Sequence, residues 1–331
     1  MHATTSAQRH GTLQRIQLFF RDLWQRLPTS IGKPLIVFAW FSFAAEVLII
    51  GTGGAVRLTG SGLGCSEWPL CTPDSLVPTP EQGYHGLIEF GNRTVTGVVG
   101  LLALAVYLLV VRFRRSRPDL HALAVTVVVG VIAQAIVGGV TVWTGLNPFI
   151  VGFHYTASLI LVCVTAAFLV RVYPEPAAVH GAPRWFRMLV YITAVPMAVT
   201  VLFGVLTTAS GPHSGDDNVI RNGFDATFMA HVHSWPGYAL VALLIVMLAV
   251  ALVQQLPLRG WVATVAALVA VQIVVGVLQA RHGLPALLVG THMVLAALSA
   301  AVYLVVMMRA AQAHTTIRTV RTAAEDQLQR Q

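Results

Sequence analysis

Residues 133–159, AQAIVGGVTVWTGLNPFIVGFHYTASL, return 138 positions later in altered form as residues 271–298, VQIVVGVLQARHGLPALLVGTHMVLAAL. The two segments share polar residues and glycines at matching positions: Gln134/Gln272, Gly138/Gly276, Gly145/Gly283, Leu146/Leu284, Gly152/Gly290 and His154/His292. A second match aligns EFGNR, which begins at Glu89, with AHVHS, which begins at Ala230. We therefore predict two similar units fused in tandem. Chance likeness between apolar helices is the alternative, and it leaves the shared polar positions unexplained.

The composition is that of a membrane protein. The chain has 331 residues, of which 56% are hydrophobic and 10% charged, and its mean hydropathy is +0.73. Apolar runs of roughly 20 residues can cross a bilayer as helices. Eight such runs occur, at about 35–56, 88–111, 119–143, 149–170, 187–208, 226–252, 260–280 and 286–308. The predicted fold is an all-α integral membrane protein with eight transmembrane helices.

The repeat divides the predicted helices into two four-helix bundles, residues 34–171 and 187–309. A short Pro-containing linker, residues 172–186, joins them, and polar flanks cover residues 1–33 and 310–331. Each unit crosses the membrane an even number of times, so both units have the same orientation. We expect a pseudo-twofold axis along the membrane normal to relate the two bundles.

Net charge of +8 would be compatible with nucleic-acid binding, but its distribution points to membrane topology instead. With the N-terminus in the cytoplasm, the inner segments hold all lysines and arginines except Arg57, Arg93, Arg221 and Arg281. This is the positive-inside bias of a multi-pass protein. We predict a cell-membrane protein with both termini cytoplasmic and no nucleic-acid partner.

Cys65 and Cys71 lie in the first outer loop, within GSGLGCSEWPLC, residues 60–71. The outer side of a cell membrane is oxidising, so a disulfide can persist there. We predict a Cys65–Cys71 disulfide. Metal binding is the alternative, and no histidine stands close to either cysteine in the sequence. The spacing does not decide whether the bond is structural or redox-active.

The second unit places one histidine on each of two helices at the same predicted depth. His233 lies near the start of the sixth run and His292 near the start of the eighth. Two imidazoles on facing helices of a bundle are a usual way to hold a b-type haem. The alternative is a pair of interfacial histidines bonded to backbone or lipid. We predict that His233 and His292 ligate haem iron.

The first unit differs at the equivalent positions. It keeps His154, but Asn92 stands where the second unit has His233, and an amide is a poor ligand for haem iron. His85, Glu89 and Asn92 would line one stripe if the helix begins near residue 83. We predict an open site with His154 on the iron and Glu89 as proton acceptor or water-positioning group. The alternative is that Glu89 pairs with Arg93.

The arginines at the outer surface offer a further interaction with a haem. Arg57, Arg93 and Arg221 could pair with haem propionates, because guanidinium groups bind carboxylates in a bidentate manner.

The motifs resemble those of the haem A synthase family. The resemblance rests on GGAVRLTGSGLGCSEWPLC (residues 53–71), IEFGNR (88–93) and the helix-opening His154. The second half adds TASGPHSGDD (208–217), HVHS (231–234) and GTHMVLA (290–296). Together they cover essentially residues 35–308. A missing second cysteine pair, in the loop after the fifth run, indicates a branch of actinobacterial type.

This resemblance implies oxidation of the C8 methyl of haem O to a formyl group, through hydroxylated intermediates, which makes haem A for cytochrome oxidase. It implies that the first unit takes the haem O substrate and the second holds a haem b cofactor. Family positions match Cys65 and Cys71 for the disulfide, Glu89 for the catalytic carboxylate, and His154, His233 and His292 for the ligands. The family's usual histidine is Asn92 here, so His154 could act alone or with His85.

The same resemblance implies haem O synthase and cytochrome oxidase assembly factors as partners, with an electron acceptor of unidentified kind. A thiol-disulfide partner and a homo-oligomer are further hypotheses. Three other classes stay open. The first is a membrane haem b electron-transfer protein, which would place histidine pairs on both sides of the membrane. A transporter and a thiol-disulfide membrane oxidoreductase follow in that order.

Overall fold

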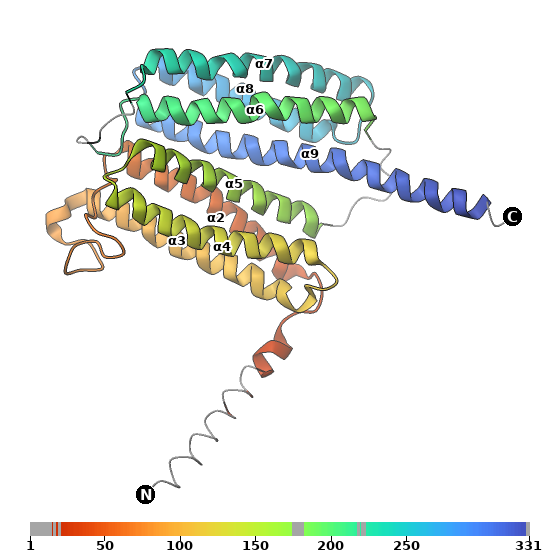
Figure 1. The fold of residues 1–331 in the computed structure, drawn as a ribbon, viewed down its shortest axis with the longest axis horizontal. Coiled ribbons are helices and arrows are strands. Elements are labelled where there is room, and N and C mark those ends of the chain that lie inside the picture. Colours follow the sequence, from red (N-terminus) through yellow and green to blue (C-terminus); the bar gives the residue numbers. More distant parts are fainter. Residues whose placement is uncertain are drawn as a thin grey trace, which may run out of the picture.

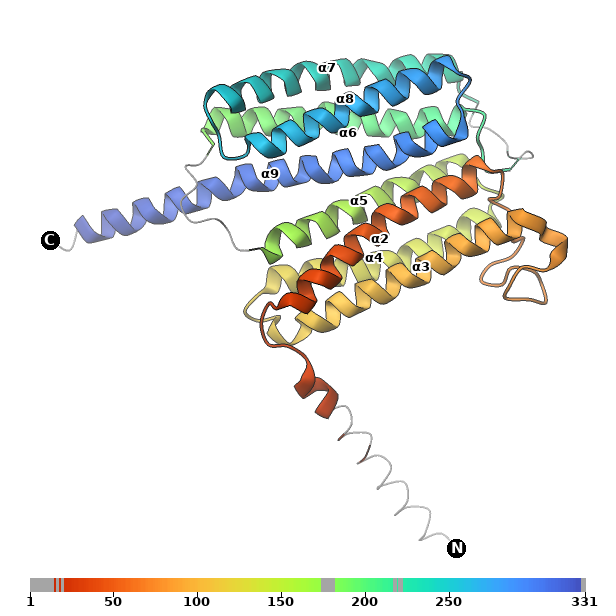
Figure 2. The ribbon, with the colours of Figure 1, turned by 180° about the vertical axis from the view of Figure 1, so that it is seen from behind.

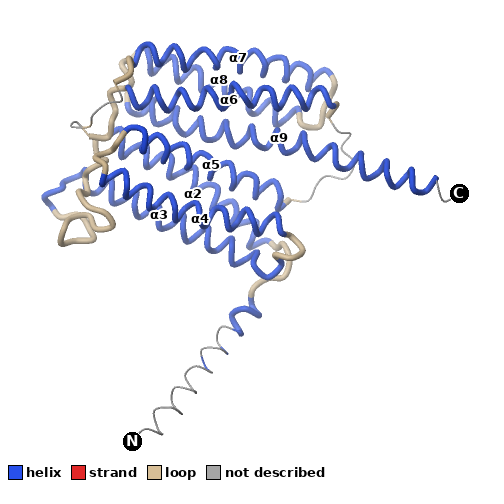
Figure 3. Tube along the Cα trace, viewed as in Figure 1, coloured by secondary structure: helices blue, strands red, loops and turns tan. Residues whose placement is uncertain are grey.

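A computed structural model describes residues 15, 18, 21–173, 182–216, 219 and 223–328, with side chains up to Ala311. Arg221 lies outside these residues, as do residues 174–181 of the predicted linker and most of the N-terminal flank. In the described part every regular element is helical, as Figure 3 shows. The helices, labelled as in Figure 1, are α2 (Lys33–Leu58), α3 (Gly83–Val110), α4 (Pro118–Trp143), α5 (Pro148–Val172), α6 (Arg184–Ser210), α7 (Ala226–Val253), α8 (Arg259–Arg281) and α9 (Ala286–Leu328). Short 3₁₀ turns, η1 (Pro80–Gln82) and η2 (Val111–Phe113), flank α3.

Eight of the described helices are long and apolar enough to cross a membrane, which confirms the predicted all-α multi-pass fold. The predicted runs and the helices agree closely at most ends. α3 begins earlier than the predicted run because its first turns are polar, and a hydropathy window passes over them. α9 continues to Leu328, so the polar tail beyond the apolar run is also helical. The predicted domain boundaries and pseudo-twofold axis stay predictions.

Local signals explain where several helices begin. α4 and α5 have proline in their first turn, where the missing N–H has no intrahelical partner to lose. The Asn147 side chain accepts hydrogen bonds from two backbone amides at the start of α5, and Asp225 accepts one at the start of α7. These N-caps satisfy donors that the helix itself leaves free.

The helix-connecting turns repeat between the two halves. Gly145 and Gly283 have φ of 58° and 74°, and Leu146 and Leu284 have φ of 59° and 60°. Each leucine amide donates at 2.8 Å to a carbonyl five residues earlier. A left-handed backbone at a leucine is uncommon, so its occurrence at both aligned positions gives structural support to the sequence match.

Each half has an apolar core of its own. Figures 1 and 2 show α6–α9 on one side of the molecule and α2–α5 on the other. Phe186, Met247 and Val262 are buried together among α6–α9, and two further clusters fill the space among α2–α5. A last cluster, with Val162 of α5 and Ala297 of α9, lies between the halves. The halves meet at three helix pairs: α5 with α9, α2 with α9, and α5 with α6.

Glycines allow the close approach between the halves. A Cβ at Gly152 of α5 would stand 2.9 Å from a methyl of Val205 in α6. The equivalent Gly290 of α9 lies against Leu58 of α2, where a Cβ would stand at 3.2 Å. Small residues at helix interfaces are the usual basis of tight packing in membranes.

We expect Gly152→Leu to weaken the packing between α5 and α6. Inserting side-chain atoms into a filled interface typically destabilises a protein by about 1–3 kcal/mol. Gly97→Leu in α3 is the matched control, because a Cβ there meets nothing within 4 Å. Thermal unfolding in detergent should give a lower midpoint for Gly152→Leu alone. Equal midpoints for both variants would contradict this packing.

Candidate haem-binding site

His233 of α7 and His292 of α9 face each other inside the second bundle. Their ring centroids lie 6.3 Å apart and their planes meet at 77°. A metal–imidazole bond is about 2 Å long, and a ring centre lies roughly 1 Å behind the bonding nitrogen. Two imidazoles on opposite sides of one iron therefore place their centroids about 6 Å apart. The spacing of this pair fits an iron atom between the rings.

Each ring lies against a glycine of a neighbouring helix. A Cβ at Gly204 of α6 would stand 2.9 Å from Cε1 of His233, and one at Gly276 of α8 would stand 3.0 Å from Cε1 of His292. Real Cβ atoms essentially never come as close to another atom as 2.9 Å, and a contact of 3.0 Å is tighter than nearly all of those observed. These positions therefore admit an imidazole beside the helix only because they are glycine.

A backbone hydrogen bond fixes which nitrogen of His233 is available. Its Nδ1 lies 2.8 Å from the carbonyl oxygen of Thr200, so Nδ1 donates and Nε2 stays free of that bond. Metal-ligating histidines commonly donate the other ring N–H to a backbone carbonyl in this way. His233 is therefore oriented as a ligand through Nε2.

Three polar atoms of α8 and α9 are buried and find no hydrogen-bond partner among the described residues. They are Nδ1 of His292 and the Oε1 atoms of Gln272 and Gln279 of α8. Buried polar atoms nearly always have a partner, so these three leave hydrogen-bonding capacity for a further polar group. Together with the ring spacing and the glycines, it fits a haem held between α7 and α9.

His154 of α5 has the same surroundings in the first bundle. Its ring lies against Gly138 of α4, where a Cβ would stand 3.6 Å from Cε1, and its Nδ1 is also buried without a partner in the described chain. Gln134 donates to the His154 carbonyl oxygen at 2.8 Å, and Gln272 donates to that of His292 at 3.0 Å. Both histidines are thus held alike by their neighbouring helix.

Asn92 replaces His233 in this arrangement and bonds to α2. Its Oδ1 accepts a hydrogen bond from Thr52 at 2.8 Å, and Gly53 lies against it as Gly204 lies against His233. No described ring therefore faces His154 from this position of α3. The structure supports the interpretation of a first site with fewer histidine ligands than the second.

His85 lies in the first turn of α3 and bonds to the loop that precedes it. Its Nδ1 is 2.9 Å from the Ser61 hydroxyl, which in turn lies 2.7 Å from the Thr59 hydroxyl. Gly64 packs so tightly on the backbone of His85 that a Cβ would stand 2.3 Å from its carbonyl oxygen. His85 therefore joins the loop to α3, and only Nε2 remains for another partner.

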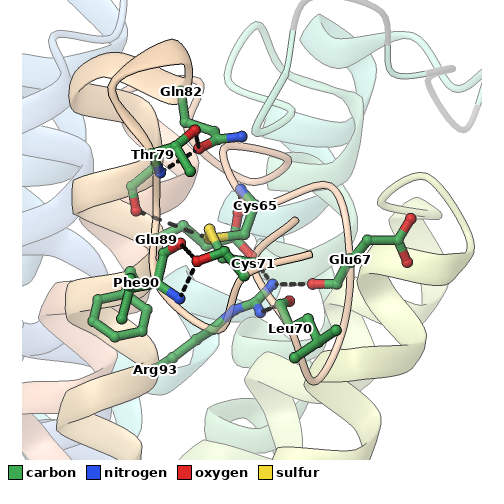
Figure 4. Close-up of a disulfide and its surroundings, with 12 residues drawn as sticks. Cys65, Glu67, Leu70, Cys71, Thr79, Gln82, Glu89, Phe90 and Arg93 are labelled. Carbon is green, nitrogen blue, oxygen red and sulfur yellow. Dashed lines mark hydrogen bonds and ion pairs between the residues drawn. A yellow bond between two sulfur atoms is a disulfide. The ribbon is translucent and has the colours of Figure 1, made fainter. Parts of the chain in front are cut away.

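Glu89 is buried, with 5% of its surface exposed, and both carboxylate oxygens have partners (Figure 4). Oε2 accepts from the Cys65 amide at 2.7 Å, and Oε1 accepts from Arg93 at 2.6 Å. The predicted alternative of a Glu89–Arg93 pair is thus present. Each oxygen keeps a second lone pair, so the pairing does not remove Glu89 as a proton acceptor.

Arg93 also holds the disulfide loop from below. It donates to the backbone carbonyls of Leu70 at 2.8 Å and Glu67 at 2.9 Å, as Figure 4 shows. The Cys65–Cys71 disulfide that we predicted is formed and fully buried. Arg93 therefore binds both Glu89 and the loop. Pairing with Glu89 was one of its two predicted roles, and pairing with a haem propionate was the other.

Arg57 has partners from the second half. It donates to the backbone carbonyls of His213, at 2.7 Å, and Thr208. A loop amide, Gly62, also donates to the Gly215 carbonyl at 2.8 Å. Arg57 thus takes part in joining the outer ends of the two halves, a role that the sequence did not indicate.

Some functional candidates have only a weak signal in the sequence. The glutamines and glycines beside the histidines stand out as shared positions of the repeat, but their contact with the rings does not. Gln279 has no such signal, since the equivalent residue is Thr141. The loop contact of Trp68 with Gly139, where a Cβ would stand 2.5 Å from the indole, is likewise visible only in the structure.

Comparison with known proteins identifies a family whose model matches most of the chain. Residues 36–304 match the COX15-CtaA family, described as "Cytochrome oxidase assembly protein". A protein named Heme A synthase from Exiguobacterium sibiricum is 30% identical over 187 residues, 55% of this chain and 61% of that relative. One of the same name from Lysinibacillus sphaericus is 41% identical over 128 residues, 37% of this chain and 40% of that relative. The chain thus matches at most 61% of the length of these relatives.

We expect Arg93→Ala to loosen the loop around the disulfide. The change leaves the buried Glu89 carboxylate without its cation, which typically destabilises by roughly 3 kcal/mol. Arg26→Ala is the matched control, because Arg26 pairs with Asp22 at the same i, i+4 spacing on an exposed helix. Hydrogen exchange of the amides of residues 61–79 should become faster in Arg93→Ala only. Unchanged exchange in that variant would show that Arg93 does not hold the loop.

Proposed function

Because the chain belongs to the COX15-CtaA family of cytochrome oxidase assembly proteins, we propose that it is a haem A synthase. It would oxidise the C8 methyl group of haem O to a formyl group and so make haem A for cytochrome oxidase. The observation that carries the proposal is the His233–His292 pair, whose ring centroids lie 6.3 Å apart inside the second bundle. The relatives named Heme A synthase support the same activity.

The second bundle would hold haem b through Nε2 of His233 and through His292. When bound, this cofactor supplies one-electron redox chemistry. Thr200 keeps the His233 ring in one tautomer, and the glycines at 204 and 276 leave room for the rings.

The first bundle would hold the substrate, haem O, through His154. Asn92 is bonded to Thr52 and is a poor ligand, so His154 has no second histidine at the equivalent place. His85 is the other candidate, through its Nε2. A single strong ligand suits a substrate that must enter and leave, whereas two suit a resident cofactor.

Glu89 would accept protons from the reacting methyl group or orient a water molecule there. Oxidation of a methyl to a formyl group removes two hydrogens from the carbon, and their electrons pass to the acceptor while their protons must be taken up in the site. A buried carboxylate held by Arg93 and the Cys65 amide has a fixed position, which is what a general base requires. The disulfide loop would cover this place and exclude water.

The remaining parts of the proposal concern location and partners. The protein would lie in the cell membrane with both termini cytoplasmic and the disulfide loop outside, as the charge bias indicates. The beginning of α2 and the far end of α9 lie at the same end of the molecule, opposite the loop that precedes α3 (Figure 2). Haem O synthase would supply the substrate, an electron acceptor would take the electrons, and assembly factors would receive the product. A thiol-disulfide partner and a homo-oligomer stay hypotheses.

Haem extraction tests the proposed function. The protein is produced together with a haem O synthase and purified, and its haems are separated by chromatography. Haem b together with haem A or hydroxylated haem O is the expected result. Haem b with unchanged haem O would instead favour a haem b electron-transfer protein, and protein without haem would overturn the assignment of the histidines.

We expect His292→Ala to remove the second-bundle haem. Loss of even an outer partner of a metal ligand weakens binding by about 10-fold or more, so loss of the ligand itself should lower haem b content at least that much. His282→Ala is the matched control, because His282 is exposed and its Nδ1 bonds only to the Leu278 carbonyl one turn earlier. The haem-to-protein ratio in the purified variants gives the answer. Equal ratios would reject His292 as a ligand.

We expect Glu89→Gln to keep both haems and lose product. General acid–base groups typically contribute about 100-fold or more to rate, and glutamine keeps the size but not the basicity. Glu81→Gln, at an exposed position before α3, should leave turnover unchanged. Product formed per bound haem O is the measure. Retained turnover in Glu89→Gln would assign Glu89 to holding the loop alone.

A further inference from the structure

One hydrogen bond crosses between the bundles directly beside both candidate iron ligands. The Tyr155 hydroxyl of α5 donates to the Met293 carbonyl oxygen of α9 at 3.1 Å. Tyr155 follows His154 in the chain, and Met293 follows His292. A continuous path therefore runs from His154 to Tyr155, across the hydrogen bond to Met293, and on to His292.

The two partners of this bond occupy equivalent positions of the repeat. They are 138 residues apart, the same separation as His154 and His292. Both pack against the apolar cluster between the halves, which contains Ile50, Leu159 and Val162. In such apolar surroundings, hydrogen bonds and charges interact more strongly than in water.

The peptide of each histidine is also held on its other side. Gln134 bonds the His154 carbonyl oxygen and Gln272 bonds the His292 carbonyl oxygen, each within its own bundle. A shift at one histidine therefore acts on Tyr155 and Met293 rather than being absorbed by a flexible loop. Rigid, packed elements of this kind can carry coupling between two sites.

We propose that Tyr155 is a positioning residue that couples the two haem sites. Through its bond to Met293, the affinity of the first bundle for its haem substrate depends on the redox state of the second site. Reduction changes the charge at the second site by one unit, and the Tyr155–Met293 hydrogen bond joins the neighbour of His292 to the neighbour of His154. The coupling must be reciprocal, because linkage acts equally in both directions. This inference rests on the proposed function.

Zinc protoporphyrin is a suitable probe of the first site, because zinc is redox-inert and takes one axial ligand in a porphyrin. It is titrated, by fluorescence, into protein that holds haem b, either oxidised with ferricyanide or reduced with dithionite. The readout is the ratio of the two dissociation constants. We expect a ratio of about 5-fold or more in the unmodified protein, within the range of measured couplings. It should fall towards one in Tyr155→Phe, with the haem b absorption spectrum unchanged.

Tyr303→Phe is the matched control. Tyr303 of α9 also donates its hydroxyl to a helix carbonyl, that of Val190 in α6 at 2.5 Å, but within the second bundle. It should keep the ratio of the unmodified protein. The proposal is overturned if Tyr155→Phe keeps that ratio too, or if the unmodified protein has a ratio of one.

If Tyr155→Phe does not retain haem b, a second variant is measured in its place. Fluorotyrosine at position 155 keeps the ring and the donor but changes the acidity of the hydroxyl, so a changed ratio supports the proposal and an unchanged ratio overturns it. Failure of the proposed function gives a different result. In that case haem extraction finds haem O unchanged, while the redox-dependent ratio is still measurable.

Discussion

Steric space beside the helices is the constraint on which the His233–His292 site depends. A membrane-spanning backbone must bond to itself as a helix, so a large ring can enter a bundle only where the facing residue is small. Gly204 and Gly276 leave that space in the second bundle, whereas a Cβ at Gly138 in the first would make only an ordinary contact with His154 at 3.6 Å. The His233 and His292 rings occupy these openings, and their centroids lie 6.3 Å apart.

The polar start of α3 serves the disulfide loop as much as the proposed chemistry. Glu89 and Arg93 between them bond to one loop amide and two loop carbonyls, while His85 bonds to Ser61. A group that would act on the substrate is therefore also a support of the loop above it. Loop position and carboxylate position are consequently set together, and neither can move without changing the bonds of the other.

The sequence predicted what depends on residue type and spacing, and missed what depends on the path of loops. The length of the apolar runs predicts the eight helices. Two cysteines in a loop expected on the oxidising outer side of the membrane predict the disulfide. A spacing of four residues predicts that Glu89 can pair with Arg93. It does not predict the hydrogen bond from the Cys65 amide to Glu89, because that bond depends on the path of the loop, which also brings Trp68 against Gly139. The repeat likewise identifies equivalent residues without showing which of them meet. The roles given to the site residues stay predictions.

The contact between Tyr155 and Met293 shows how the two halves of a fused repeat can diverge in sequence during evolution. In a homodimer of one four-helix unit, a residue beside the symmetry axis faces its own copy, and any substitution alters both sides at once. Covalent joining of the two copies removes that restriction. A tyrosine can then face a methionine, and an asparagine can replace a histidine in one copy alone. Single substitutions can then turn one copy into a cofactor site and the other into a substrate site.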